Sequence, residues 1–375
     1  LRDKIKATAR QNMNIIVSHG DSDHYNLLIE GRDKGTRFIL PLIPPSNPQD
    51  PTSSSQAAQT NVRILLGGKR EDYSKDFAQT VSSLSPVEVL GRNQTKKTTA
   101  IFINELEEGE LDNATIPSGE GVDCRILAAL HSTASNTNRA SIVLRIASTK
   151  TSVLLTGDAD KLVYEHILSK NEKQEYGDKR EDKKSKKKEQ PTSHKTSQEA
   201  SVYTIASKIV QASHHGADTE GSNSRGWFEV ISPEYIVISA GTNAGLGHPR
   251  RAALENMMFS QKLSKTTEQH FLQCYSDGSF IDYHPLTKDF LTVARFDNDY
   301  TLGLTSLGIF NTASQGAMTY HHERFTFEGN PLTRTNTSPL VDRFIEIASR
   351  EAGENIIEMT LPRMDIEAAK LKELL

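Results

Sequence analysis

Several apolar, strand-like runs of this sequence end in histidine or aspartate, and this pattern limits the fold more than any other feature. The run Ile15-Ile16-Val17 is followed by "SHGDSDHY", which places two histidines and two aspartates within six positions. Burying such groups without partners is costly, so something must compensate them. Similar polar groups follow the apolar runs that begin at 153, 209 and 235. These strand ends together predict one site to which several loops contribute.

The residue types of the first motif suit a divalent metal. Imidazole and carboxylate side chains are ligands of zinc, manganese and iron. The alternative is a surface turn in which these side chains only cap a helix. The motif offers enough ligands in one tight loop for two ions: His19, Asp21, Asp23 and His24.

The other strand ends each allow two interpretations when taken alone. Asp158, in "LLTGDAD", could bridge two ions, or it could be the N-cap of a helix at 161–168. The paired His214 and His215 in "SHHG" favour a site, whereas His248 in "GHP" is weaker evidence. Their occurrence in one chain favours the functional interpretation.

The remaining sequence alternates between strand-like and helix-like patterns, so we predict a mixed α/β (α+β) fold. Segment 44–60 is rich in Pro, Ser and Gln, and segment 169–200 is rich in Lys, so both are predicted to be disordered or mobile insertions. Trp227 and Phe228 are predicted to pack in the core. Strands are predicted at 14–17, 37–45, 61–68, 87–91, 124–130 and 140–148, within 151–160 and 203–216, at 234–241, and repeatedly between 268 and about 328. Helices are predicted at 71–84, 161–168, 250–263 and 339–353.

Composition excludes several classes of protein. The formal net charge of −4 gives no overall basic field for nucleic acid. Cys124 and Cys274 lie far apart with no CxxC pattern, so we expect a reducing, cytoplasmic location without a disulfide framework. No apolar stretch approaches the length of a transmembrane helix, and we expect no membrane association. The chain begins with Leu1 rather than Met, and we expect that N-terminal sequence precedes it.

The order of these motifs resembles the metallo-β-lactamase superfamily. HxDxDH, a strand with TGD, a strand with HHG and a strand followed by GHP occur in that order over roughly 13–284. More narrowly, the chain resembles the hydrolase domain of the ComEC competence proteins, in which an aspartate replaces the second histidine of HxHxDH, as Asp21 does here. The resemblance implies an αββα sandwich over 1–284, with the site at the loop ends of one sheet edge. Residues 285–375 would then form a β-rich extension that ends in a helix.

The resemblance also implies a role for each motif residue. His215 would be the last metal histidine, since "ASHHG" occupies the place of the family's "PGHG". His214 and His248 would lie near the substrate, and His248 would act as a general acid or hold a phosphate oxygen. His19 and Asp21 would bind the first metal, Asp23 and His24 the second, and Asp158 would bridge them, so that the expected catalytic residues are Asp23, Asp158, His214 and His248.

The chain departs from the family pattern in three respects. The third histidine of the first metal has no clear match, and we predict that His131 and Asn138, which lie in that region, have core or turn roles. The family's N-terminal strand motif Asp-Val-Gly-Gln-Gly is absent. The membrane channel of ComEC is absent too, so DNA uptake does not transfer to this chain.

We therefore expect a hydrolase that uses one or two divalent ions, zinc or manganese, to cleave phosphodiester bonds in nucleic acid or nucleotides. The HHG and GHP motifs together favour phosphodiesters over lactams, because a phosphate presents more oxygens to bind. Lys183–Lys188 would be a solvated surface or a nucleic-acid tether. Two alternatives stay open, a lactone, ester or thioester hydrolase on the same scaffold, and a non-catalytic interaction module stabilised by metal.

Overall fold

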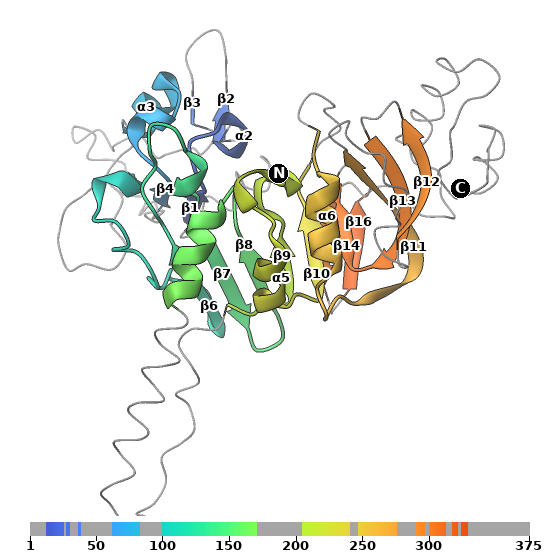
Figure 1. The fold of residues 1–375 in the computed structure, drawn as a ribbon. Helices are drawn as coiled ribbons and strands as arrows, with labels where there is room; N and C mark the ends of the chain where they lie inside the picture. The colour runs from blue at the N-terminus through green and yellow to red at the C-terminus, as the bar shows by residue number, and fades with distance from the viewer. Residues whose placement is uncertain are drawn as a thin grey trace, which may run out of the picture. The chain divides into compact units, whose positions relative to one another are not determined.

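The computed structural model has a mixed α/β fold, as predicted, and divides into two compact units (Figure 1). Unit 1 comprises Leu1–Thr149 and Thr156–Ile167, and unit 2 comprises Lys150–Leu155 and Leu168–Leu375. The structure describes residues 13–25, 28–30, 37–38, 62–82, 100–170, 205–240, 247–275, 290–296, 300–312, 317–321 and 324–328.

Some of the sequence-based expectations fall outside the described residues. They include the first insertion, the strand at 87–91, the lysine-rich run and the helix at 339–353. The boundary near residue 284 lies in the stretch 276–289, which also falls outside them. The second insertion was predicted to begin at 169, but residues 169–170 still belong to the helix that starts at 161.

The core of unit 1 is a parallel sheet that is buried on both faces. Strands β1 (Met13–Val17), β4 (Val62–Leu66) and β5 (Ile101–Phe102) are adjacent in the order β1-β4-β5. Burial on both faces explains why these strands are continuous apolar runs rather than alternating ones. One face contributes Ile15, Val17, Ile64, Leu66 and Phe102 to a hydrophobic cluster, and the other contributes Ile16, Leu65 and Ile101 to a second cluster.

Aromatic side chains cover the first face of this sheet. Helix α3 (Lys75–Ser82) begins after Ser74, whose hydroxyl accepts a hydrogen bond from the backbone N–H of Phe77. The Phe77 ring lies 4.3 Å from the ring of Tyr25, which belongs to the short helix α2 (Ser22–Tyr25). Tyr73 packs against both rings, and its hydroxyl donates to the carbonyl of Gly67. This cluster anchors α2, the element that carries His24.

A β-hairpin covers the second face. Strands β6 (Val122–Ala128) and β7 (Val143–Ser148) are antiparallel, and their inward side chains share a cluster with those of β4. The connection between them contains the 3-10 turn η4 (Asn138–Ala140) and many polar residues. Unit 1 also contains the pair β2 (Ile29–Glu30) and β3 (Arg37–Phe38), and the turns η2 (Arg70–Asp72) and η3 (Ile103–Glu105).

Unit 2 contains parallel strands in the order β8 (Ser152–Leu155), β9 (Ile209–Gln211), β10 (Tyr235–Ile238) and β14 (Ile309–Asn311). Helices α5 (Arg225–Ile231) and α6 (Arg251–Met258) contact each other. Trp227 and Phe228 of α5 are buried, which confirms the prediction that they pack in the core. Repeated strands occur in the stretch 268–328, where they were predicted: β11 (Lys265–Tyr275), β12 (Phe290–Phe296) and β13 (Tyr300–Leu307) form an antiparallel sheet, and β15 (Ala317–His321) pairs with β16 (Arg324–Glu328).

We expect Phe77→Ala to lower the free energy of unfolding by about 3–5 kcal/mol, because it removes a buried ring from the aromatic cluster. Lys75→Ala, at an exposed position of the same helix, should change it by no more than about 0.5 kcal/mol. Urea unfolding followed by circular dichroism measures both. Equal stability of the two variants would show that the cluster does not hold α3 against the sheet.

Candidate metal centre

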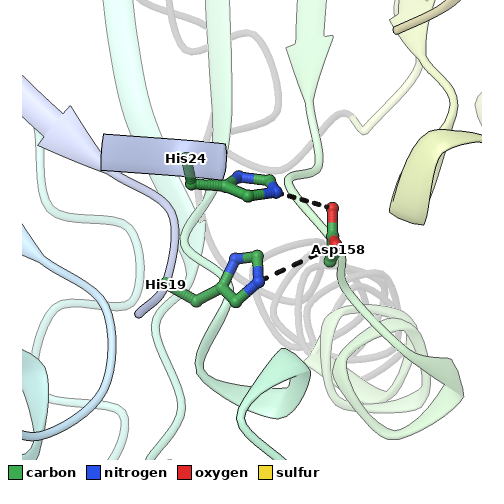
Figure 2. A group of neighbouring side chains, drawn as sticks. All are labelled: His19, His24 and Asp158. Carbon is green, nitrogen blue, oxygen red and sulfur yellow. Dashed lines mark ion pairs between the residues drawn. The ribbon is translucent and has the colours of Figure 1, made fainter. Parts of the chain in front are cut away.

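Three side chains of unit 1 converge on one point (Figure 2), and of these His19 and Asp158 are buried and His24 is partly buried. His19 follows β1, His24 lies in α2 and Asp158 lies three residues beyond β8. The Nε2 atom of His19 is 3.7 Å from one carboxylate oxygen of Asp158, and the Nε2 atom of His24 is 3.2 Å from the other. The two imidazole rings are 4.1 Å apart between centroids. The donor atoms of the three residues all lie within 4.8 Å of one another.

This donor set fits a divalent metal. Metal–ligand bonds of about 2.0–2.2 Å in a tetrahedral site separate the ligand atoms by about 3.4 Å, close to the spacings of these side chains. His19 is fully buried, and its Nε2 atom makes no hydrogen bond within the described part of the chain. A buried polar atom without a hydrogen bond costs about 1–3 kcal/mol, and a bound cation would remove that cost. Three protein ligands also leave a fourth position for water.

A neighbouring residue performs the capping role that was the alternative for Asp158. The carboxylate of Asp160 accepts a hydrogen bond from the backbone N–H of Val163, at the start of the helix that begins at 161. The other oxygen of Asp160 accepts one from the side chain of Asn136. The N-cap of this helix is therefore Asp160, and the carboxylate of Asp158 points to His19 and His24 instead.

Asp21 and Asp23 lie at the exposed rim of this group. A carboxylate oxygen of Asp21 is 3.4 Å from Nε2 of His19, and one of Asp23 is 3.7 Å from Nε2 of His24. Their side chains are 47% and 55% exposed. The polar contact with His19 holds the pKa of Asp21 below its usual value, against the opposing effect of partial burial. The structure thus brings four motif residues and Asp158 together within unit 1.

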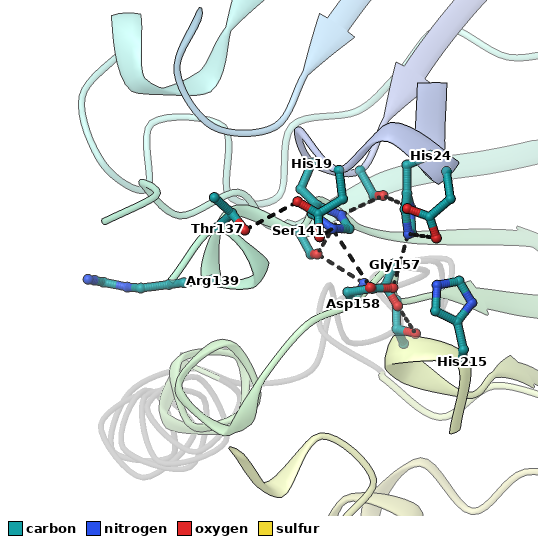
Figure 3. A network of polar contacts seen from close by, with 12 residues as sticks. His19, His24, Thr137, Arg139, Ser141, Gly157, Asp158 and His215 are labelled. Carbon is teal, nitrogen blue, oxygen red and sulfur yellow. Dashed lines mark hydrogen bonds and ion pairs between the residues drawn. The ribbon is translucent and has the colours of Figure 1, made fainter. Parts of the chain in front are cut away.

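Two serines behind the histidines were missed by the sequence analysis (Figure 3). The hydroxyl of Ser18 lies 2.7 Å from Nδ1 of His24 and 3.2 Å from Nδ1 of His19. The hydroxyl of Ser141 accepts a hydrogen bond from the backbone N–H of Asp158 and lies 3.4 Å from Nδ1 of His19. The only available signal was the position of Ser18 directly before the motif, because serine is too common for its presence alone to indicate a site.

Gly157 lets the Asp158 loop approach these serines closely. The φ angle of Gly157 is +55°, in the left-handed region that residues with a Cβ atom rarely adopt. A Cβ atom at this position would lie 2.6 Å from Cβ of Ser18 and 3.1 Å from Oγ of Ser141. Glycine is therefore required here both by conformation and by space.

The two residues considered for the missing third histidine have other surroundings. The Nε2 atom of His131 lies 3.0 Å from the carbonyl oxygen of Leu106, in agreement with the predicted turn role. Asn138 begins the turn η4. In the same connection, the hydroxyl of Thr137 donates to the carboxylate of Asp21 at 3.4 Å. The connection between β6 and β7 therefore supplies hydroxyl groups to the site.

Unit 2 contains a histidine group of its own, formed by the HHG and GHP motifs. His214 and His215 lie in the turn η5 (Ser213–Gly216), and His248 precedes Pro249. The ring centroid of His248 is 5.7 Å from that of His214 and 6.4 Å from that of His215. The Nδ1 atom of His215 lies 2.6 Å from the carbonyl oxygen of Ser239. The two motifs lie together within unit 2, and their assigned roles stay predictions.

The turn η5 holds both of its histidines in the left-handed region, at φ of 48° and 54°. Such conformations cost about 1–3 kcal/mol each and persist where the surroundings enforce them. The side chain of Asn223 provides that support, because it accepts a hydrogen bond from the backbone of Ser213 and donates to the carbonyl groups of Ser213 and Ala217. Strain of this kind is concentrated at functional sites.

Comparison with known proteins gives no family. No protein-family model matches the chain, and no curated protein matches it. Among the described residues, no helix has both the length and the apolar character that crossing a bilayer requires. The side chains of the site are therefore the basis for any functional assignment.

We expect Asp158→Ala to abolish metal binding, because Asp158 is the group that faces both histidines. Asp160→Ala should keep the metal and lower the free energy of unfolding by about 0.5–2 kcal/mol through loss of the helix cap. Metal analysis of the two purified proteins, with denaturant unfolding of each, measures both effects. If Asp160→Ala lost the metal and Asp158→Ala kept it, the roles assigned to the two aspartates would be reversed.

We expect Gly157→Ala to lower the free energy of unfolding by about 1–3 kcal/mol, because the backbone is left-handed and the added methyl group displaces Ser18. Gly119→Ala is a matched control, since a Cβ there meets no atom within 4 Å. Zinc titration of both variants by calorimetry should show weaker binding for Gly157→Ala alone. Unchanged zinc affinity in Gly157→Ala would show that the backbone conformation of this loop does not affect metal binding.

Proposed function

We propose that this protein is a metal-dependent hydrolase of the metallo-β-lactamase type that cleaves phosphodiesters in nucleic acid or nucleotides. The observation that supports this most directly is the convergence of His19, His24 and Asp158. His19 and His24 come from the motif that follows β1, and Asp158, far from them in the sequence, follows β8. Active sites are commonly built in this way, from loops placed by a rigid scaffold.

The arrangement within unit 1 supports the fold part of the proposal. Helix α3 and the aromatic cluster cover one face of the β1-β4-β5 sheet, and the β6-β7 hairpin covers the other. This order of layers agrees with one half of an αββα sandwich. We propose that residues 1–284 adopt that sandwich, because the motifs follow the superfamily order from "HGDSDH" to "GHP".

The residues of unit 1 would hold one divalent ion, zinc or manganese. A bound ion in such a site supplies a water of lowered pKa and neutralises charge on phosphoryl oxygens. His19 and His24 would bind it through Nε2, because their Nδ1 atoms face Ser18. Asp158 would bind it through its carboxylate, and the hydrogen bond from its backbone N–H to Ser141 orients this residue.

Asp23 and Asp21 are placed to act on water and substrate at the open side. Both carboxylates are about half exposed, so they contact solvent as well as the histidines. A carboxylate at such a rim can orient a water by accepting a hydrogen bond from it, and it can then take the proton of that water as a general base. Asp21 stays ionised over the neutral pH range, since its pKa is lowered.

The proposal is tested by metal content and by hydrolysis of bis-p-nitrophenyl phosphate with added manganese or zinc. We expect the wild type to hydrolyse this substrate. His24→Ala should lower the rate more than about 100-fold, because loss of a metal ligand should cost more than the roughly 10–100-fold that loss of a ligand's outer hydrogen-bond partner costs. His131→Ala is the matched control, because this histidine of unit 1 contacts the carbonyl of Leu106 and not the metal group.

The outcomes separate the proposal from its alternatives. Turnover of esters or lactones without turnover of phosphodiesters would assign the same scaffold to another substrate class. A wild type that binds metal and cleaves none of these substrates would be an interaction module. Equal rates for His24→Ala and wild type would exclude the metal group from the reaction.

A further inference from the structure

We propose that Ser18 is a positioning residue that sets the ring tautomer of both His19 and His24 through one shared hydroxyl, and so prepares both Nε2 atoms to bind the metal. The inference rests on the metal site of the proposed function, and it concerns a residue outside the predicted ligand set. Its basis is the placement of the Ser18 hydroxyl against Nδ1 of the two rings.

The two imidazoles have the same orientation relative to this hydroxyl. Each presents Nδ1 to Ser18, at 2.7 Å for His24 and 3.2 Å for His19. Each presents Nε2 to Asp158 on the opposite side, at 3.2 Å for His24 and 3.7 Å for His19. The hydroxyl therefore lies on the Nδ1 side of both rings. The Asp158 carboxylate lies on their Nε2 side (Figure 2).

The proton count of a hydroxyl restricts the tautomers that can coexist. A serine hydroxyl accepts up to two hydrogen bonds and donates one, and a neutral imidazole donates at one nitrogen and accepts at the other. Ser18 can donate to only one ring at a time, so at least one ring must carry its hydrogen on Nδ1. When both rings carry hydrogen on Nδ1, Ser18 accepts from both, and both Nε2 lone pairs face Asp158. That arrangement alone allows both rings to bind metal through Nε2.

Contacts on two sides fix the backbone of Ser18, and they therefore fix the position of its hydroxyl. Its carbonyl oxygen accepts a hydrogen bond from the backbone N–H of Ile142 at 3.0 Å. A Cβ atom on Gly67 would lie 1.7 Å from that oxygen, so glycine is required beside it. Gly157 packs against Cβ of Ser18 on another side. Three loops of unit 1 therefore hold Ser18 in place.

Burial makes the hydroxyl hard to replace. The side chains of His19 and His24 are 0% and 12% exposed, so little water is available to accept a hydrogen bond from Nδ1. His19 has a second hydroxyl nearby, on Ser141 at 3.4 Å. His24 has the shorter contact with Ser18, so loss of the Ser18 hydroxyl should affect His24 more than His19. Outer partners of metal-binding histidines fix the tautomer and raise ligand basicity, and their loss costs about 10–100-fold in metal affinity.

The experiment compares three variants of the full chain with the wild type. Ser18→Ala removes the shared hydroxyl, and Ser18→Thr keeps a hydroxyl at the same position. Ser132→Ala is the matched control, because Ser132 is a buried serine of unit 1 whose hydroxyl makes no hydrogen bond to any described residue. Nitrogen-15 NMR of the imidazoles, recorded without metal, identifies the tautomer of each ring. Zinc and manganese titrations give the affinities.

We expect hydrogen on Nδ1 of both rings in the wild type and in Ser132→Ala. Ser18→Ala should shift His24 toward the tautomer with hydrogen on Nε2 and weaken metal binding by about 10–100-fold. Ser18→Thr should restore at least part of the wild-type tautomer population and of the metal affinity. A wild type in which Nδ1 of His24 carries no hydrogen would overturn the proposal without any variant. Unchanged tautomers and affinities in Ser18→Ala would overturn it as well.

These readouts are independent of catalysis. If the wild type binds metal with the expected tautomers but hydrolyses nothing, the proposed function fails and the role of Ser18 stands. If the wild type hydrolyses phosphodiesters and Ser18→Ala has wild-type tautomers and metal affinity, the role of Ser18 fails and the function stands. A Ser18→Ala protein that does not fold leaves the wild-type tautomer measurement and Ser18→Thr as the test.

Discussion

The burial of the Asp158 carboxylate beside two imidazoles is the constraint around which the loops of unit 1 are arranged. Removing a carboxylate from water costs several kcal/mol, which must be offset by opposite charge or by hydrogen bonds. Asp158 is 3% exposed, and its carboxylate faces His19 and His24, both in the segment that follows β1, while its backbone N–H donates to the hydroxyl of Ser141 in the loop between β6 and β7. Each loop therefore has to reach the same point, and the close contacts at Gly157 and Gly67 follow from that requirement.

The sheet of unit 1 determines where those loops begin. β1 and β4 are parallel neighbours, so their carboxyl ends lie at the same edge. Val17 and Gly67 are joined by a backbone hydrogen bond directly beyond that pairing. The residues that follow β1 include Ser18 and His19, so the first ligand leaves the sheet from a strand buried on both faces. Ligand sites lie at the carboxyl ends of strands in many open α/β sheets, and this edge has the same geometry.

The sequence predicted the apolar runs and the chemistry at their ends, because both are local patterns. Its local pattern left open whether Asp158 binds a metal or is the N-cap of the helix at 161, and Asp160, which follows the same strand, was not considered as the cap. Only contacts with Asn136 and Val163 identify Asp160 as the cap. Ser141 could not be predicted either, because it contacts His19 across 122 positions of sequence.

Helix α5 shows a second limit of local patterns. Its buried residues were predicted as core, but the helix itself was not predicted. Helices usually end at glycine or asparagine in the left-handed conformation, and here Ser232 occupies that position at φ of 53°. The glycine or asparagine that commonly marks the end of a helix is therefore absent here, and Pro233 is the stop signal that the sequence offers.

The charges around the metal group have a consequence for an anionic substrate. Asp158 is buried between the histidines, and Asp21 and Asp23 lie at the rim, so three carboxylates surround two imidazoles. With neutral imidazoles the group carries a net negative charge, which repels a phosphodiester at short range. A divalent cation bound among these side chains removes most of that charge and gives the phosphate an attractive partner. Metal binding should therefore precede substrate binding in the proposed hydrolase, because the same carboxylates that attract the cation exclude the substrate until it is bound.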